Sequence, residues 1–336
     1  GWHSDNYLLS SILFLIIVCV QLLAYREPLL RSFHELLARV HTDLERSRVY
    51  NIKSVYHILE ANYGEAVRAG LQALYYCGIH LPENPGTPRV LIALARVRWR
   101  AYRLGLNRVN RLPELQSESL KLAVELFGNL GGAMYQHNAN LYALAIIKMY
   151  DITLKYGHSV NTPMALNLFG VIEGGVLSNL RGARLLSLLA LRLNRRFPDA
   201  TVRGRAHYMS AIFYSGWFQP LSKSIEHLSK AHHAAAAASD FYALGYIQDN
   251  RPFLELLNGT RLEEVDRTVA ESLEFARRSS YQEGPDFILP YRQLIRALRG
   301  ETRARGSFTT MSTTKKRTIR VFARIRISCR STFSTF

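Results

Sequence analysis

The feature that most constrains this chain is the helical spacing of its apolar residues, which continues from residue 32 to residue 300. Successive segments place apolar side chains three and four positions apart, and Gly, Asn or Pro residues separate these segments. No stretch alternates apolar and polar residues for long enough to indicate a sheet. The sequence therefore predicts an all-α fold.

The first helices carry small residues at a regular spacing. Ala66 and Ala73 lie seven positions apart, and small residues there let a second helix approach closely. The pattern is typical of the second helix of a tetratricopeptide repeat, with residues 48–60 as its partner helix. Because such helix pairs must stack to bury their apolar faces, we expect a tetratricopeptide-like α-α superhelical repeat array.

The same signals predict the remaining helices and the division of the chain. The predicted helices cover residues 141–156, 162–177, 181–197, 201–215, 220–238, 241–257, 262–279 and 288–299. The glycine pairs at 131–132 and 174–175 indicate helix breaks or close packing. A proline-rich linker at residues 80–88 follows the first pairs. We expect four parts: an apolar segment at 1–30, tetratricopeptide-like pairs at 31–81, the main array at 82–300 and a disordered tail at 301–336.

Residues 7–25 contain no charge and predict an extra N-terminal helix. At about 1.5 Å per residue this segment reaches roughly 28 Å, close to the thickness of the hydrocarbon core of a bilayer. The first basic residues, Arg26 and Arg31, follow it, so a membrane span would place the helical body in the cytoplasm. Three interpretations stay open: a membrane anchor, a buried core helix, and sequence from outside the true reading frame.

The C-terminal tail is strongly basic. The formal net charge of the chain is +17, and residues 301–336 hold nine basic residues against one acid. The tail is rich in Ser and Thr and has no helical period, so we expect a disordered arm able to contact nucleic acid or acidic lipid. Residues 309–318 can also be encoded by bases whose neighbouring frame specifies an acidic linker. We therefore expect the tail to be a frameshifted continuation without a function of its own.

One basic and aromatic cluster is the candidate interaction patch. It consists of Arg96, Arg98, Trp99, Arg100, Tyr102 and Arg103, and Arg108 and Arg111 follow it. Arginines interleaved with aromatic residues can bind a phosphate backbone. These arginines do not keep to one helical face, however. We therefore expect a solvated linker or a contact with an acidic partner protein in preference to nucleic acid.

No catalytic motif is present in the sequence. A P-loop needs a Gly-Lys pair, and the chain contains none. The His-Arg-Asp and Asp-Phe-Gly motifs of protein kinases are also missing. Cys19, Cys77 and Cys329 lie far apart without a CxxC pair, which argues against a zinc site and a disulfide framework. We expect no enzyme activity, no cofactor and no metal.

Several segments, taken in order, resemble the helical middle of large multidomain hybrid signalling kinases. They are residues 63–81, 138–157, 217–221 and 288–300, and the likeness covers residues 33–307. In that family a Ser/Thr-kinase-like domain and a P-loop ATPase module precede a tetratricopeptide-like region, and a GAF domain and a sensor histidine kinase follow it. The resemblance implies a non-catalytic regulatory and protein-interaction region of a phosphorelay kinase.

That resemblance also implies the partners, which would be other proteins or the neighbouring kinase and ATPase domains. The alternative takes the sequence at face value. It describes a free-standing helical-repeat adaptor, anchored to a membrane by residues 7–25 and carrying a basic tail.

Overall fold

A computed structural model of the chain describes residues 33, 36–60, 62–279 and 284–302. These residues form helices and contain no β-strand, so the predicted all-α class is confirmed for them. The finer expectation of a tetratricopeptide-like superhelix stays a prediction. Residues 7–25 and the tail from residue 303 lie outside the described residues. Among the helices that are described, none combines the length and hydrophobicity needed to cross a bilayer.

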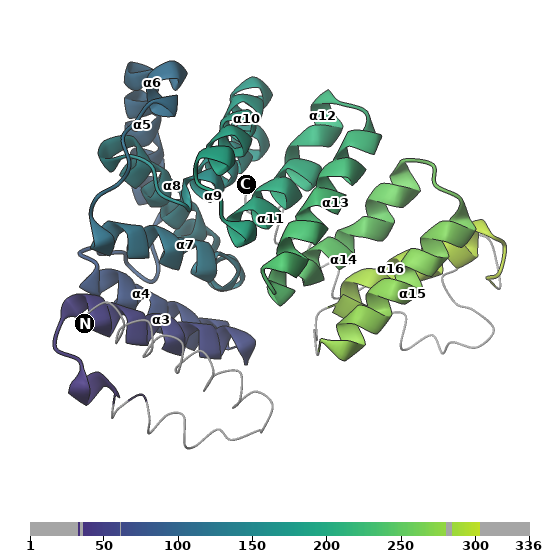
Figure 1. Cartoon of the computed structure of the whole chain (residues 1–336), viewed down its shortest axis with the longest axis horizontal. Helices are drawn as coiled ribbons and strands as arrows, with labels where there is room; N and C mark the ends of the chain where they lie inside the picture. Colours follow the sequence, from purple (N-terminus) through teal and green to yellow (C-terminus); the bar gives the residue numbers. More distant parts are fainter. Residues whose placement is uncertain (1–32, 34–35, 61, 280–283, 303–336) are drawn as a thin grey trace. The chain divides into compact units, whose positions relative to one another are not determined.

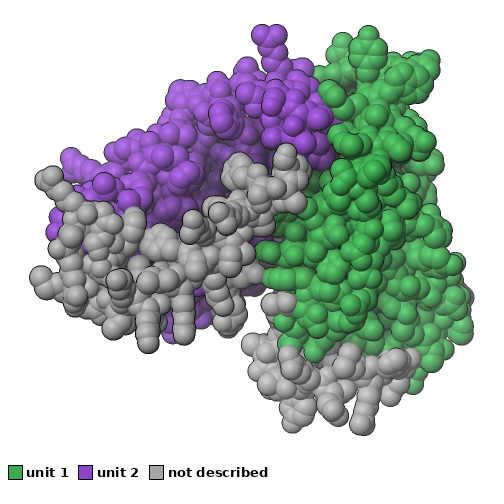
Figure 2. Space-filling view, turned by 180° about the vertical axis from the view of Figure 1, so that it is seen from behind, with its two compact units in different colours: residues 1–165 green, residues 166–336 purple. Residues whose placement is uncertain are grey.

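The chain divides into two compact units, residues 1–165 and 166–336 (Figure 2). Helix α9 (Thr162–Val171) contains the boundary between them. The other described helices of the first unit are α3 (Asp43–Leu59), α4 (Tyr63–Tyr76), α5 (Thr87–Leu104), α6 (Leu106–Asn110), α7 (Glu118–His137) and α8 (Ala139–Tyr156) (Figure 1).

In the first unit, α3 and α4 pack along one another, as the small residues predicted. Ala66 and Ala73 are fully buried, and the hydroxyl of Ser47 on α3 donates to the carbonyl oxygen of Ala73 (2.9 Å). Gly70 belongs to the same helix and faces α7. A Cβ at Gly70 would lie 2.3 Å from the side chain of Leu130, so only glycine permits this contact. The close approach of helices is therefore built into the sequence of α4.

Helix α8 ends at Tyr156, as the sequence indicated, and begins at Ala139, two residues before the predicted start. The side chain of Asn138 accepts from the backbone N–H of Leu141 (3.0 Å), and Gly157 ends the helix at φ +108°. The next residue, His158, exchanges backbone hydrogen bonds with the loop before α7. Its N–H donates to Pro113 (2.8 Å), and its carbonyl oxygen accepts from Leu115 (2.7 Å). These bonds fix the end of α8 against the segment that follows α6.

The second unit is a further series of helices (Figure 1). They are the π-helix η1 (Ile172–Val176), α10 (Leu180–Arg196), α11 (Ala200–Met209), the π-helix η2 (Ser210–Ser215), α12 (Gly216–Phe218), α13 (Leu221–Ala237), α14 (Phe241–Leu257), α15 (Leu262–Arg278) and α16 (Gly284–Leu298). One core cluster of this unit gathers buried alanines, leucines and Ile247 of η2, α13 and α14, with Tyr208 of α11 packed against it. Gly204 lets α11 approach α13, since a Cβ there would lie 3.1 Å from the backbone nitrogen of Ala235.

For the glycine pairs we expect either a helix break or close packing, and the structure contradicts the helix break. Residues 131–132 lie inside α7, so a helix break there is wrong. Residues 174–175 lie in η1, where α9 continues as a π-helical turn instead of stopping. Close packing explains Gly174, because a Cβ there would lie 3.2 Å from the Cβ of Ala183 on α10. The glycine pairs are visible in the sequence, but the sequence alone does not show whether such a pair interrupts a helix or lets a second helix approach closely.

Candidate interaction surface on helix α5

The candidate patch lies on a helix. Its residues 96–103 belong to α5, so the expectation of a solvated linker is wrong for them. The helix begins at Thr87 with Pro88 in its first turn, and Gly105 ends it at φ +71°. These are ordinary start and stop signals, and they bracket apolar residues at helical spacing. That combination was the sequence signal that could have revealed α5.

One face of α5 is buried against α8. Val90, Leu94 and Val97 are spaced four and three positions apart, and each is at most 8% exposed. This spacing places them on one side of the helix. The opposite side is therefore directed away from α8.

Three sets of polar contacts hold α5 and α6 in place on α8. At the start of α5, the side-chain amide of Asn140 donates to the backbone oxygen of Pro85 (3.2 Å) and to Thr87 Oγ1 (3.3 Å). In the second half of α5, Arg100 pairs with Asp151. Beyond it, His158 Nε2 lies 2.8 Å from the carbonyl oxygen of Val109 in α6. With these contacts α5 presents a fixed surface.

The outer face of α5 exposes large apolar side chains. Tyr102 is 86% exposed, Trp99 60%, Leu91 58% and Ile92 54%. Isolated exposed apolar residues are common on proteins, but a contiguous set on one rigid helix is typical of an interaction site. Leu91 and Ile92 were not part of the predicted patch. Their exposure depends on which face of α5 meets α8, and the sequence alone did not show that.

The same helix is strongly basic. Residues 87–112 contain seven arginines and no acidic residue. Arg100 differs from the rest of the patch because it turns toward Asp151, whereas Arg96, Arg98 and Arg103 are exposed. The guanidinium carbon of Arg103 lies 4.9 Å from the centre of the Trp99 ring, at a distance suited to a cation–π contact. The outer face of α5 thus combines apolar area with positive charge.

Lys148 of α8 adds to this positive potential. Burial, followed by the nearby charges of Lys155 and Arg100, holds the pKa of Lys148 below its usual value. Asp151 is the acid that offsets these cations, and its two oxygens are used by Arg100 and Lys155. The region therefore favours the approach of negative charge.

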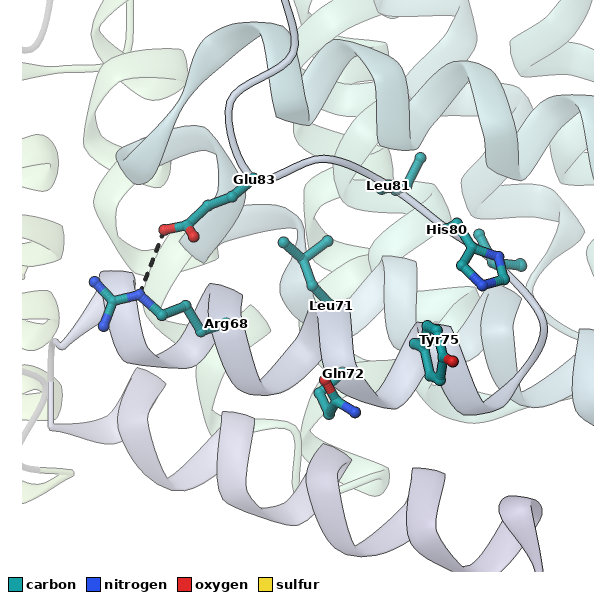
Figure 3. A pocket seen from close by; sticks show the side chains of 8 residues that line it. Arg68, Leu71, Gln72, Tyr75, His80, Leu81 and Glu83 are labelled. Carbon is teal, nitrogen blue, oxygen red and sulfur yellow. Dashed lines mark hydrogen bonds and ion pairs between the residues drawn. The ribbon is translucent and has the colours of Figure 1, made fainter.

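A groove on α4 is the other candidate in the first unit. It has a volume of about 310 Å³ and lies between α4 and the loop that follows it (Figure 3). Arg68 and Glu83 form an ion pair at one end (3.4 Å), and the rings of Tyr75 and His80 meet edge to face at the other (4.8 Å between centres). Because its charged groups already pair with one another, this groove attracts a charged partner less than α5 does.

Comparison with protein-family models, with curated proteins and with solved structures finds no match for this chain.

Proposed function

We propose that this chain is a non-catalytic helical module that binds a partner protein through the outer face of α5. One observation carries the proposal: Trp99, Tyr102, Leu91 and Ile92 are exposed on a helix that also bears exposed arginines and no acid. Aromatic residues and arginine are the residues enriched at protein interfaces and at their energetic hot spots.

The aliphatic residues favour a protein over a nucleic acid. Arginine and aromatic side chains alone suit a phosphate backbone with stacked bases. Leu91 and Ile92 lie on the same face and gain nothing from phosphate, whereas apolar side chains of a partner protein would bury them. An acidic partner would also satisfy the arginines, as was expected for the predicted patch.

The resemblance to hybrid signalling kinases gives this proposal a biological setting. In that setting the partner is another protein or a neighbouring kinase or ATPase domain. Its binding to α5 would favour one arrangement of the helices and so change the activity of the kinase domains. The proposal for α5 does not depend on this setting, because it is argued from the exposed side chains.

Site-specific photocrosslinking in the native cells tests the proposal. A photoreactive amino acid replaces Tyr102, and in the control it replaces Phe241, which is also well exposed (63%) but lies on α14 of the second unit. We expect a defined protein crosslink from position 102 and none to the same protein from position 241.

The crosslinked protein is then purified and its affinity measured by calorimetry. We expect Trp99→Ala combined with Tyr102→Ala to weaken binding at least tenfold, since aromatic hot spots commonly contribute this much. Far-UV circular dichroism checks that the double variant is folded. No crosslink at position 102, or wild-type affinity of the folded double variant, would overturn the proposal.

A further inference from the structure

The exposed side chains of α5 form parallel rows. Arg89, Arg96 and Arg103 recur every seven residues, and all three are exposed. A seven-residue step turns a straight helix by only about 20°, so the three side chains lie nearly in line over about 21 Å of helix. Within the part of the chain that the structure describes, none of the three has an ion pair. The row is therefore a line of positive charge without its counter-charge.

A second set of positions forms an apolar seam beside that row. Ile92, Ala95, Trp99 and Tyr102 are spaced three, four and three residues apart, and all are exposed. This is the spacing of the contact positions of a two-stranded coiled coil. Ala95, between the large side chains, leaves room for a side chain of a facing helix. The arginine row then occupies a flanking position, where charged residues select the partner.

We propose that the partner segment seated on α5 is an amphipathic helix whose acidic residues recur every seven positions beside its apolar seam. This inference rests on the proposed function of the α5 face, and it adds the chemistry and spacing of the partner. The apolar seam of the partner covers Ile92, Trp99 and Tyr102. Its carboxylates lie opposite the three arginines, and this match sets the register.

The charge pattern argues against a second copy of this chain, and the seven-residue spacing separates the proposed helix from a lipid surface. A second copy of this chain, pairing α5 with α5, would bring like-charged arginine rows to the same seam, which is unfavourable. A lipid surface would suit an apolar sector with basic residues beside it. A bilayer, however, has no fixed seven-residue spacing of charges, so its binding does not depend on a match with the arginine row. A dependence of binding on the positions of the acidic residues therefore distinguishes the proposed helix from an anionic membrane.

Two synthetic peptides test the inference with the full chain. The first has Leu and Ile at seam positions and Glu every seven residues on the flank. The control has the same composition, net charge and apolar seam, but its Glu residues are moved to the face opposite the seam. Affinity is measured by fluorescence anisotropy of labelled peptide, and peptide helicity by circular dichroism. We expect the first peptide to bind at least tenfold more tightly and to become helical on binding.

A charge exchange tests the arginine row directly. In the variant R89E/R96E/R103E, binding of the Glu peptide should fall at least tenfold, and a peptide with Lys at the same positions should bind instead. All three positions are exposed, so we expect this variant to fold, and circular dichroism checks that it does. Equal affinity of the two peptides, or no rescue by the Lys peptide, would overturn the inference.

The outcomes separate this inference from the proposed function. If both peptides bind equally and W99A/Y102A abolishes the binding of both, the α5 face binds proteins but does not select the positions of their acidic residues. If neither peptide binds and anionic vesicles or a single-stranded oligonucleotide bind through the arginines, the protein-binding function itself is wrong.

Discussion

Arg100 and Asp151, which lie 51 positions apart in the sequence, form an ion pair that joins α5 to α8. The second carboxylate oxygen of Asp151 lies 2.8 Å from Lys155 Nζ. The carboxylate side chain is only 16% exposed, so a single acid holds two cations at the edge of the helix interface. Together with the packing of Val90, Leu94 and Val97 on α8, the pair sets the rotation of α5 about its own axis and so which side chains α5 exposes.

Replacing Asp151 with Asn should destabilise the first unit. The change leaves Arg100 partly buried without its counter-charge, and we expect the free energy of unfolding to fall by about 1–3 kcal/mol. Urea denaturation measures the loss. Glu226→Gln is the matched control, because Glu226 is exposed and its partners among the described residues are Lys223 and Lys230 of its own helix. Such surface pairs contribute little. Equal losses for the two variants would contradict this prediction.

Adding a methyl group at Gly70 should separate α4 from α7. The new Cβ would lie 2.3 Å from Leu130, so we expect Gly70→Ala to cost about 1–3 kcal/mol through overpacking. Gly128→Ala is the control, since a Cβ at this position in α7 meets no atom within 4 Å. Alanine is the better helix former, so the control should be neutral or more stable by up to about 1 kcal/mol. Thermal unfolding of both variants tests this prediction. If G70A is as stable as the wild type, α4 and α7 do not contact each other at Gly70 and Leu130.

Acid should weaken the contact between α11 and α13. His207 Nδ1 and His227 Nδ1 lie 2.9 Å apart, so the N–H of one ring donates a hydrogen bond to the unprotonated nitrogen of the other. Burial, followed by the charges of His227, Lys230 and Arg203, lowers the pKa of His207 from 6.5 to about 4. The unfolded chain therefore binds more protons than the folded chain between these two values. The stabilisation is complete above pH 6.5 and is lost as the pH falls toward 4.

The measurement is the free energy of unfolding in urea at several pH values from 7.5 to 4. His207→Gln should flatten its decline between pH 6.5 and 4. His80→Gln should leave the decline unchanged, because it removes an exposed histidine of the first unit. Parallel curves for wild type and H207Q would show that this histidine is not the source of the acid sensitivity.

Cys77 should react slowly with thiol reagents in the folded protein. Burial raises the pKa of the Cys77 thiol, and the contact with the Ser47 hydroxyl (3.1 Å) only partly offsets this effect. The thiolate is the reactive form, so burial and a raised pKa act in the same direction. In a variant with Cys19 and Cys329 replaced by Ser, we expect modification at pH 8 to become fast only in denaturant. Rapid labelling of the folded variant would mean that the α3–α4 pair opens readily.

The sequence predicted the helices of the second unit closely, because local signals determine where a helix starts and stops. The predicted helix at 241–257 has the bounds of α14, Phe241–Leu257, with Asp240 capping its first turn. Capping side chains and glycines act within a few residues, so the sequence alone carries this information. The same local rules would have found α5 from Pro88 and Gly105. The arginines, however, do not keep to one helical face, and this pattern favours a linker when it is considered alone.

By itself, the sequence determined the all-α class that the described residues show, and that residues 96–103 are both basic and aromatic. Only the tertiary structure decided which face of α5 is buried. A helix with apolar residues on both sides has two possible orientations. The orientation is set by the packing of Val90, Leu94 and Val97 on α8 and by the ion pair between Arg100 and Asp151. These contacts join residues far apart in the chain, so helical periodicity could not show that Trp99, Tyr102 and the row of arginines would remain exposed.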